Sequence, residues 1–325
     1  MKKLLVVMGL AVATTASAQL NLIPNVGVGV GVGTTGISID ASATFTDFLG
    51  ARVGVDIMPK FKIDKTLDLG IEDKTSGKTV SDMYKYIDDL NARIDNYNST
   101  RPAGMAALEK VDKSMLPTGD IPKNVDIQGK FANTTWHVLF DVYPMGKISS
   151  FHLTAGAYFG PSELISVYNM NNSELPNGLT PINQWNNAIL GAEANPSSLL
   201  YTQVVQPNNL KMIGADMGDY FITPNPAENG NVKASAKVKS FRPYVGLGFG
   251  RAVPKGRVGF QFDLGCQFWG KPEVYVPTYD RKTGTYQTEK IDADKAGDDA
   301  GKILKTVSKI SVYPVLNLRL VGRIL

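Results

Sequence analysis

The 325-residue sequence has little of what disulfide, metal or nucleic-acid chemistry requires. It contains one cysteine, Cys266, and two histidines, His137 and His152. A single cysteine cannot form an internal disulfide, and it excludes zinc sites built on paired thiolates. The chain also has no large excess of one charge, because it contains 34 Lys and Arg and 30 Asp and Glu, and the basic residues are scattered along the chain. We therefore expect no metal, no cofactor and no nucleic-acid partner.

Long hydrophobic runs are absent beyond the N-terminus. There, Lys2 and Lys3 precede an apolar stretch from Leu4 to Ala13, and the small residues Ala16-Ser17-Ala18 follow. This pattern predicts a secretory signal peptide over residues 1–18, cleaved before Gln19. After Gln19 no stretch of eighteen apolar residues occurs. The mature chain is therefore either soluble or enters a membrane by something other than helices.

The body of the chain alternates between apolar and polar residues with a period of two, as strands with two unlike faces do. From Arg257 to Gly270, for example, Phe260, Phe262 and Leu264 share one face while Gln261 and Asp263 share the other. Eight segments can be interpreted in this way: 22–32, 37–46, 51–65, 125–143, 149–168, 232–252, 257–270 and 310–320.

The connections between these segments alternate in length. Short turns occur at 46–50, 144–149 and 253–256, whereas the other end has connections over about 66–124, 169–231 and 277–306, plus one tight turn at 33–36. Short turns at one end and long loops at the other are typical of a transmembrane β-barrel. The predicted fold class is all-β: one domain over 19–325, an eight-stranded antiparallel transmembrane β-barrel with long, partly helical extracellular loops.

A secreted soluble barrel also alternates, so the composition of the two faces has to decide between them. The glycines lie on the polar faces, where a narrow barrel interior has least room. The outward aromatics fit two interfacial girdles: Phe45, Phe140, Phe151 and Phe249 near the short turns, and Trp269 and Tyr275 near the long loops. Both observations favour the membrane barrel.

The export signal, the eight alternating segments, the long loops and the final segment Val315–Leu325 resemble small outer-membrane barrels of the OmpA/OmpX kind. Residues Ala16 to Gln19 are similar to the processing sites of exported Bacteroidota proteins. The resemblance implies location in the outer membrane, with membrane lipid as a partner.

Ionisable residues of both signs have inward parity. A charge in such a narrow interior has to be paired or hydrated. We expect a structural network of carboxylate–guanidinium pairs that plugs the barrel, and the alternative is a gated small-solute pore. The candidate lumenal residues are Asp40, Arg52, Asp56, His137, Asp141, His152, Arg242, Asp263, Arg319 and Arg323.

Catalytic and cofactor motifs are weak. His137 and His152 lie on neighbouring strands, where we expect them roughly opposite each other, with Asp141 nearby. No Gly-x-Ser-x-Gly nucleophile motif accompanies them, so an envelope lipid or peptide hydrolase is the least favoured function. The dinucleotide-like glycines of 31–36 precede a strand instead of a helix, and the calcium-like segment 292–303 lacks the final glutamate. We predict a non-enzymatic protein.

The long loops are the most informative feature for function. Ser81 can cap a helix with Met83, Ile87, Leu90 and Ile94 at helical spacing, and Met105, Leu108 and Val111 suggest a second short helix. The Asn- and Pro-rich 169–231 loop is expected to be irregular, with Trp185, Leu199, Leu200 and Tyr201 as anchors, and 274–279 is expected to pair with 285–291 as a hairpin. The favoured function is a monomeric anchor whose loops bind an extracellular protein or glycan, and the alternative is a channel.

Overall fold

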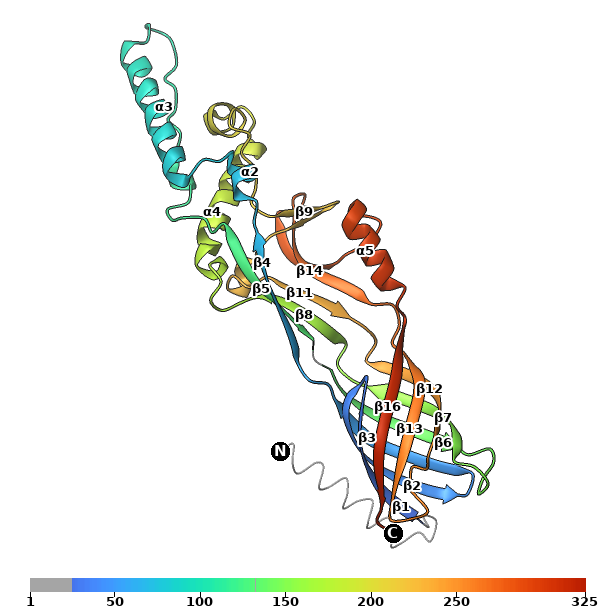
Figure 1. Ribbon diagram of the computed structural model, residues 1–325. Coiled ribbons are helices and arrows are strands. Elements are labelled where there is room, and N and C mark those ends of the chain that lie inside the picture. Colours follow the sequence, from blue (N-terminus) through green and yellow to red (C-terminus); the bar gives the residue numbers. More distant parts are fainter. Residues whose placement is uncertain (1–24, 132) are drawn as a thin grey trace.

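The computed structural model describes residues 25–131 and 133–325, which form a closed barrel with an elongated cap at one end (Figure 1). The expected signal peptide lies outside the described residues. Both ends of the described chain lie at the short-turn end of the barrel, where Val26 N–H donates to the carbonyl of Leu325. The cap lies at the opposite end, and α3 (Val80–Thr100) is its most distant part.

The barrel has eight antiparallel strands, as the alternation predicts. Their order is β1-β16-β13-β12-β7-β6-β3-β2, and β1 pairs with both β16 and β2, which closes the ring. The strands are β1 (Asn25–Gly33), β2 (Gly36–Thr46), β3 (Leu49–Ile57), β6 (Thr134–Val142), β7 (Phe151–Phe159), β12 (Phe241–Phe249), β13 (Val258–Phe268) and β16 (Val312–Arg323).

The two faces of the barrel wall differ sharply in composition. The outer face carries exposed apolar side chains on all eight strands, such as Val53 at 52% and Leu318 at 49%. The inner face carries buried polar ones, such as Asp56 and Gln261, both at 0%. The interior is narrow: a Cβ on Gly54 would meet the Asp40 side chain and backbone. The predicted placement of glycine on the inner face follows from this lack of room.

Aromatic side chains lie on the outer face near both ends of the barrel. Phe151 and Phe249 pack near the short turns with ring centroids 5.4 Å apart. At the cap end the prediction of Trp269 and Tyr275 is wrong: Trp269 is only 9% exposed, because it packs on Tyr313 and donates to the Ile310 carbonyl, and Tyr275 lies in the cap. The exposed aromatics at that end are Trp136, Phe159, Phe241 and Phe268.

A second sheet forms the scaffold of the cap. Its order is β4-β5-β8-β11-β14-β10-β9, and β15 also pairs with β14. The long segments expected as single strands are divided between barrel and cap, with breaks such as residues 58–60 between β3 and β4. The cap strands are β4 (Phe61–Asp68), β5 (Asn124–Phe131), β8 (Glu163–Asn169), β9 (Ala215–Met217), β10 (Tyr220–Ile222), β11 (Lys233–Lys237), β14 (Glu273–Asp280) and β15 (Thr285–Lys290). The β14–β15 pair confirms the predicted hairpin.

Helix α3 buries Met83, Ile87, Leu90 and Ile94, as their spacing predicts, but its N-cap is Thr79 with a capping box to Asp82. The second helix expected around Met105–Val111 does not form. This segment runs back along α3 because Asn91 and Asn98 each bond both the N–H and the C=O of one residue in it, Val111 and Leu108 respectively. Side chains of α3 thus satisfy backbone groups that a helix would satisfy internally.

The 169–231 connection is far more ordered than expected. It contains the twenty-residue helix α4 (Leu175–Ala194), in which Trp185 is 1% exposed. Together α3, α4 and their neighbours form the main apolar core of the cap. The remaining elements are α2 (Ile71–Thr75), α5 (Asp298–Ser308), the π-helix η2 (Leu200–Val205) and the 3₁₀ turns η1 (Lys113–Met115) and η3 (Pro226–Glu228). None of the described helices combines the length and apolar character needed to cross a bilayer.

Candidate functional site: the barrel lumen

The centre of the lumen is organised by one arginine. Arg52 on β3 is 4% exposed, and its guanidinium reaches two carboxylates on other strands. Nη2 lies 2.8 Å from Asp141 Oδ1, and Nη1 lies 3.0 Å from Asp263 Oδ2. Thr154 donates a further hydrogen bond to Asp141. Strands β3, β6, β7 and β13 are therefore joined through the interior by one charged cluster.

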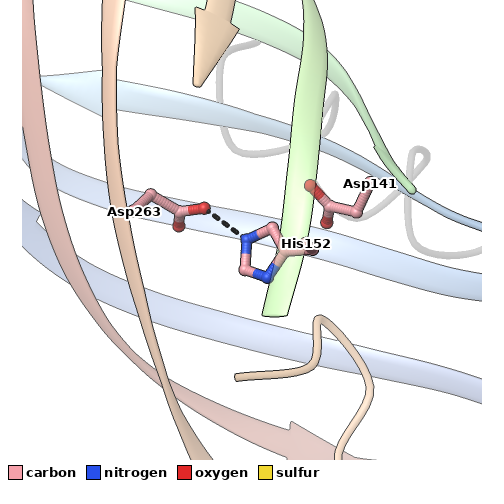
Figure 2. A group of neighbouring side chains, drawn as sticks. All are labelled: Asp141, His152 and Asp263. Atoms are coloured by element: carbon pink, nitrogen blue, oxygen red, sulfur yellow. Dashed lines mark hydrogen bonds and ion pairs between the residues drawn. The ribbon is translucent and has the colours of Figure 1, made fainter. Parts of the chain in front are cut away.

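His152 lies beside Asp141 and Asp263 in this cluster (Figure 2). Its Nε2 lies 2.9 Å from Asp263 Oδ1 and 3.2 Å from Gln261 Nε2. Ligand atoms of Asp141, His152 and Asp263 all lie within 4.8 Å of one another, which is a spacing that a metal ion could use. However, Arg52 is bonded to both of these carboxylates. A cation would have to displace a paired guanidinium, so these residues fit an ion-pair network better than a metal centre.

Two further pairs lie in the lumen. Arg319 on β16 pairs with Asp40 on β2, and it also donates to Gln261. His137 Nδ1 lies 2.6 Å from Asp56 Oδ2, and Thr35 donates to the other oxygen of Asp56. Every lumenal carboxylate named here therefore has a cationic or imidazole partner, as a buried charge requires.

Larger side chains fill the lumen at the level of Arg52 and His137. Leu139, Tyr158, Tyr244 and Val315 are each at most 3% exposed and form one cluster. The Tyr158 and Tyr244 rings meet edge to face with centroids 5.4 Å apart. The cavity between this cluster and the charged groups measures about 10 Å³. That volume suffices for roughly one water molecule, so side chains fill most of the space between these groups.

Most of the candidate residues come together in the lumen, but two do not. Arg242 is fully buried at the cap end and donates to the carbonyls of Lys239 and Pro161, without an ion pair to any described carboxylate. Arg323 does not join the lumenal network: it pairs with Gly27 at the short-turn end of the β1–β16 ladder, is exposed, and its Nε donates to the Leu325 carbonyl.

The expected opposition of the two histidines is also wrong. In the β6–β7 ladder His137 pairs with Tyr158, whereas His152 lies at the short-turn end, with its ring 5.4 Å from that of Tyr143. A hairpin register places residues opposite each other by their distance from the turn, which parity does not report. The sequence interpretation also missed the uncharged members of the network, Thr35, Thr154 and Gln261. Their inward parity is the signal that could have identified them.

Comparison with known proteins identifies no family. No protein-family profile and no curated protein matches the chain. Among solved structures, Acinetobacter baumannii CarO is 12% identical with a TM-score of 0.38, covering 91% of this chain and 96% of its own. CarO2 of the same species is 12% identical with a TM-score of 0.39, covering 93% of this chain and 99% of its own. A major outer membrane protein from Thermus thermophilus is 11% identical with a TM-score of 0.35, covering 92% of this chain and 98% of its own. These values carry no argument about function, and the fold rests on the strand ladders above.

Proposed function

We propose that this chain is a non-enzymatic outer-membrane protein in which a sealed barrel anchors an extracellular cap that binds a partner at the cell surface. The observation that carries the proposal is a lumen filled by side chains, with its ion pairs, its tyrosines and a cavity of about 10 Å³ between them. The barrel then serves to hold the cap. The OmpA/OmpX-like grouping, the export by residues 1–18 and a Bacteroidota source belong to the same proposal.

The apolar outer wall supports membrane insertion. Exposed valine, leucine and phenylalanine side chains surround the barrel, with aromatic residues at both margins. A protein surrounded by water rarely exposes such a continuous apolar surface. In a bilayer the same residues contact lipid, and closure of the ladder leaves no unpaired backbone edge within the barrel. One copy is therefore sufficient, and we propose a monomer.

Trp136 provides a test of insertion because it is 54% exposed on the outer face near the cap. In vesicles containing brominated phospholipids, we expect strong quenching of tryptophan fluorescence in the parent protein. The Trp136→Phe variant should lose most of this quenching, because Trp185 and Trp269 are 1% and 9% exposed within the protein. Equal quenching in both proteins would contradict a lipid-facing wall.

Single-channel conductance tests the sealed lumen. The refolded protein, checked for its shifted mobility on an unboiled gel, should show no steady conductance in a planar bilayer. Steady conductance that changes in an Arg52→Gln or Asp263→Asn variant would establish a pore and would overturn the proposed function. The proposed absence of catalysis is supported by the two histidines, since both are bonded to carboxylates at positions that solvent hardly reaches.

A further inference from the structure

A polar cleft lies on the cap, where β5, β8 and β11 are adjacent strands of the sheet. Its volume is about 550 Å³, which is within the range of small-molecule sites. Two lysines and four asparagines supply most of its polar groups: Lys130, Lys233, Asn169, Asn171, Asn229 and Asn231. Ser166 and Tyr168 complete the lining.

The strand register fixes the floor of this cleft. Lys130 pairs with Ser166 across β5 and β8, and Lys233 pairs with Tyr168 across β11 and β8. Residues 166 and 168 are two apart on one strand, so these four side chains share one face of the sheet. The Tyr168 hydroxyl donates to Gln128 at 2.8 Å, which holds the ring in place. The floor is therefore built on paired strands and not on a free loop.

The charge of the lining has one sign, because none of the lining residues is acidic. Lys130 Nζ lies 5.7 Å from the centre of the Tyr168 ring and has no ion pair with a described carboxylate. Lys233 has one partner, Glu163 at 3.1 Å, and this contact is half exposed to solvent. The cleft therefore attracts an anion, and its amides can both donate to and accept from hydroxyl groups.

Asn169 borders the cleft, but it follows Tyr168 on β8 and pairs with Ile127, so its side chain lies on the opposite face of the sheet from Ser166 and Tyr168. Its side chain is 2% exposed, and Oδ1 accepts from the Val232 N–H at 2.7 Å. The buried Nδ2 has no hydrogen-bond partner among the described residues.

We propose that this cleft binds an acidic oligosaccharide, a sugar chain bearing carboxylates. The volume of the cleft suits a short sugar chain. Its amide and hydroxyl groups can bond sugar hydroxyls, the Tyr168 ring can contact a sugar face, and the two ammonium groups can pair with carboxylates. An apolar ligand does not fit, because no aliphatic side chain contributes to the lining. The inference rests on the proposed function, since it names the ligand class that the cap binds.

The test is isothermal titration of the refolded full chain in detergent micelles with tetragalacturonate, using uncharged maltotetraose as the matched sugar. We expect tetragalacturonate to bind at least ten times more tightly. The Lys130→Gln/Lys233→Gln variant should lower that affinity at least tenfold. The control Lys65→Gln/Lys85→Gln removes the same charge from exposed sites outside the lining and should change the affinity less than twofold.

Equal affinity for the two sugars, equal losses in the two lysine variants, or no heat of binding at millimolar tetragalacturonate would each overturn the proposal. Binding in micelles does not depend on the lumen. A barrel that conducts ions and still binds tetragalacturonate would therefore contradict the sealed anchor and support this binding site. A barrel that does not conduct and does not bind tetragalacturonate would support the sealed anchor and contradict this binding site.

Discussion

Asp40 on β2 and Arg319 on β16 form an ion pair across the intervening strand β1, over the position of Gly29. Gly29 pairs directly with Asp40, and Arg319 Nε lies 3.0 Å from Asp40 Oδ2. A Cβ on Gly29 would lie 2.5 Å from Arg319 Nη2 and 3.1 Å from Asp40 Oδ1. The glycine therefore leaves room for a charged pair that links the two neighbours of β1 through the lumen.

A Gly29→Ala variant should accordingly destabilise the barrel. Its methyl group has to displace the guanidinium from a packed interior, and overpacking of this kind typically costs about 1–3 kcal/mol. The measurement is the temperature at which the folded band on an unboiled gel disappears. Gly129→Ala in the cap is the control, because the atom nearest to a Cβ there is the Ile63 carbonyl oxygen at 3.6 Å, an ordinary contact. Equal midpoints for both variants would contradict the role of Gly29.

The Arg52 cluster predicts a larger effect. An Arg52→Met variant keeps most of the side-chain volume but leaves Asp141 and Asp263 without their guanidinium partner. Removing one partner of a buried pair costs about 3–5 kcal/mol. Urea unfolding of the refolded protein in micelles should show this loss, and adding Asp141→Leu should recover part of it because one uncompensated charge disappears. A single variant as stable as the parent would show that the network contributes nothing to folding.

The barrel could be predicted from the sequence because its wall obeys one simple rule. Each strand contacts an apolar surround on one face and a crowded polar interior on the other, so alternation reports both. The division of the long segments could not be predicted, because strands also alternate in the cap and a period of two does not show where a sheet leaves the barrel. Arg323 shows a related limit, since it has inward parity and pairs with Gly27 in the ladder, yet it is exposed at the end of the barrel.

Helix α4 was missed for a different reason. It contains Gly178 and, inside the helix, Pro181, which disfavour helix formation in isolation. Its stability comes from the cap core, where Ile182, Trp185 and Ile189 are at most 1% exposed. Packing between segments distant in sequence overrides local propensity there. The alternation of the sequence also could not predict which lumenal residues form ion pairs. The strand register and the closure of the barrel decide which inward side chains come into contact.

The capping box of α3 predicts a local pH dependence. Hydrogen bonds from Thr79 lower the pKa of Asp82 below its ordinary value of 3.8. Because the pKa is lower in the folded state, this carboxylate stabilises the helix start above about pH 4 and loses that effect as the pH falls through its folded pKa. Amide exchange over residues 80–84 should therefore accelerate more steeply below pH 4 in the parent than in an Asp82→Asn variant. Asp89→Asn is the control, since Asp89 lies outside the capping box.

Asn186 joins α4 to the chain that leaves it, and its loss should loosen the cap without unfolding the barrel. The side chain is 0% exposed, with Oδ1 accepting from the Ile213 N–H at 2.7 Å and Nδ2 donating to the Ile213 carbonyl at 3.1 Å. Asn186→Leu leaves the Ile213 N–H without its partner, at a cost of about 1–3 kcal/mol, while the Ile213 carbonyl keeps its hydrogen bond from Thr223. We expect faster cleavage within 169–231 in limited proteolysis, while the folded barrel keeps its mobility on an unboiled gel. Asn187→Leu changes the adjacent, exposed asparagine and should leave the cleavage rate unchanged. Simultaneous loss of cap and barrel in the Asn186 variant would instead show that the two fold as one cooperative unit.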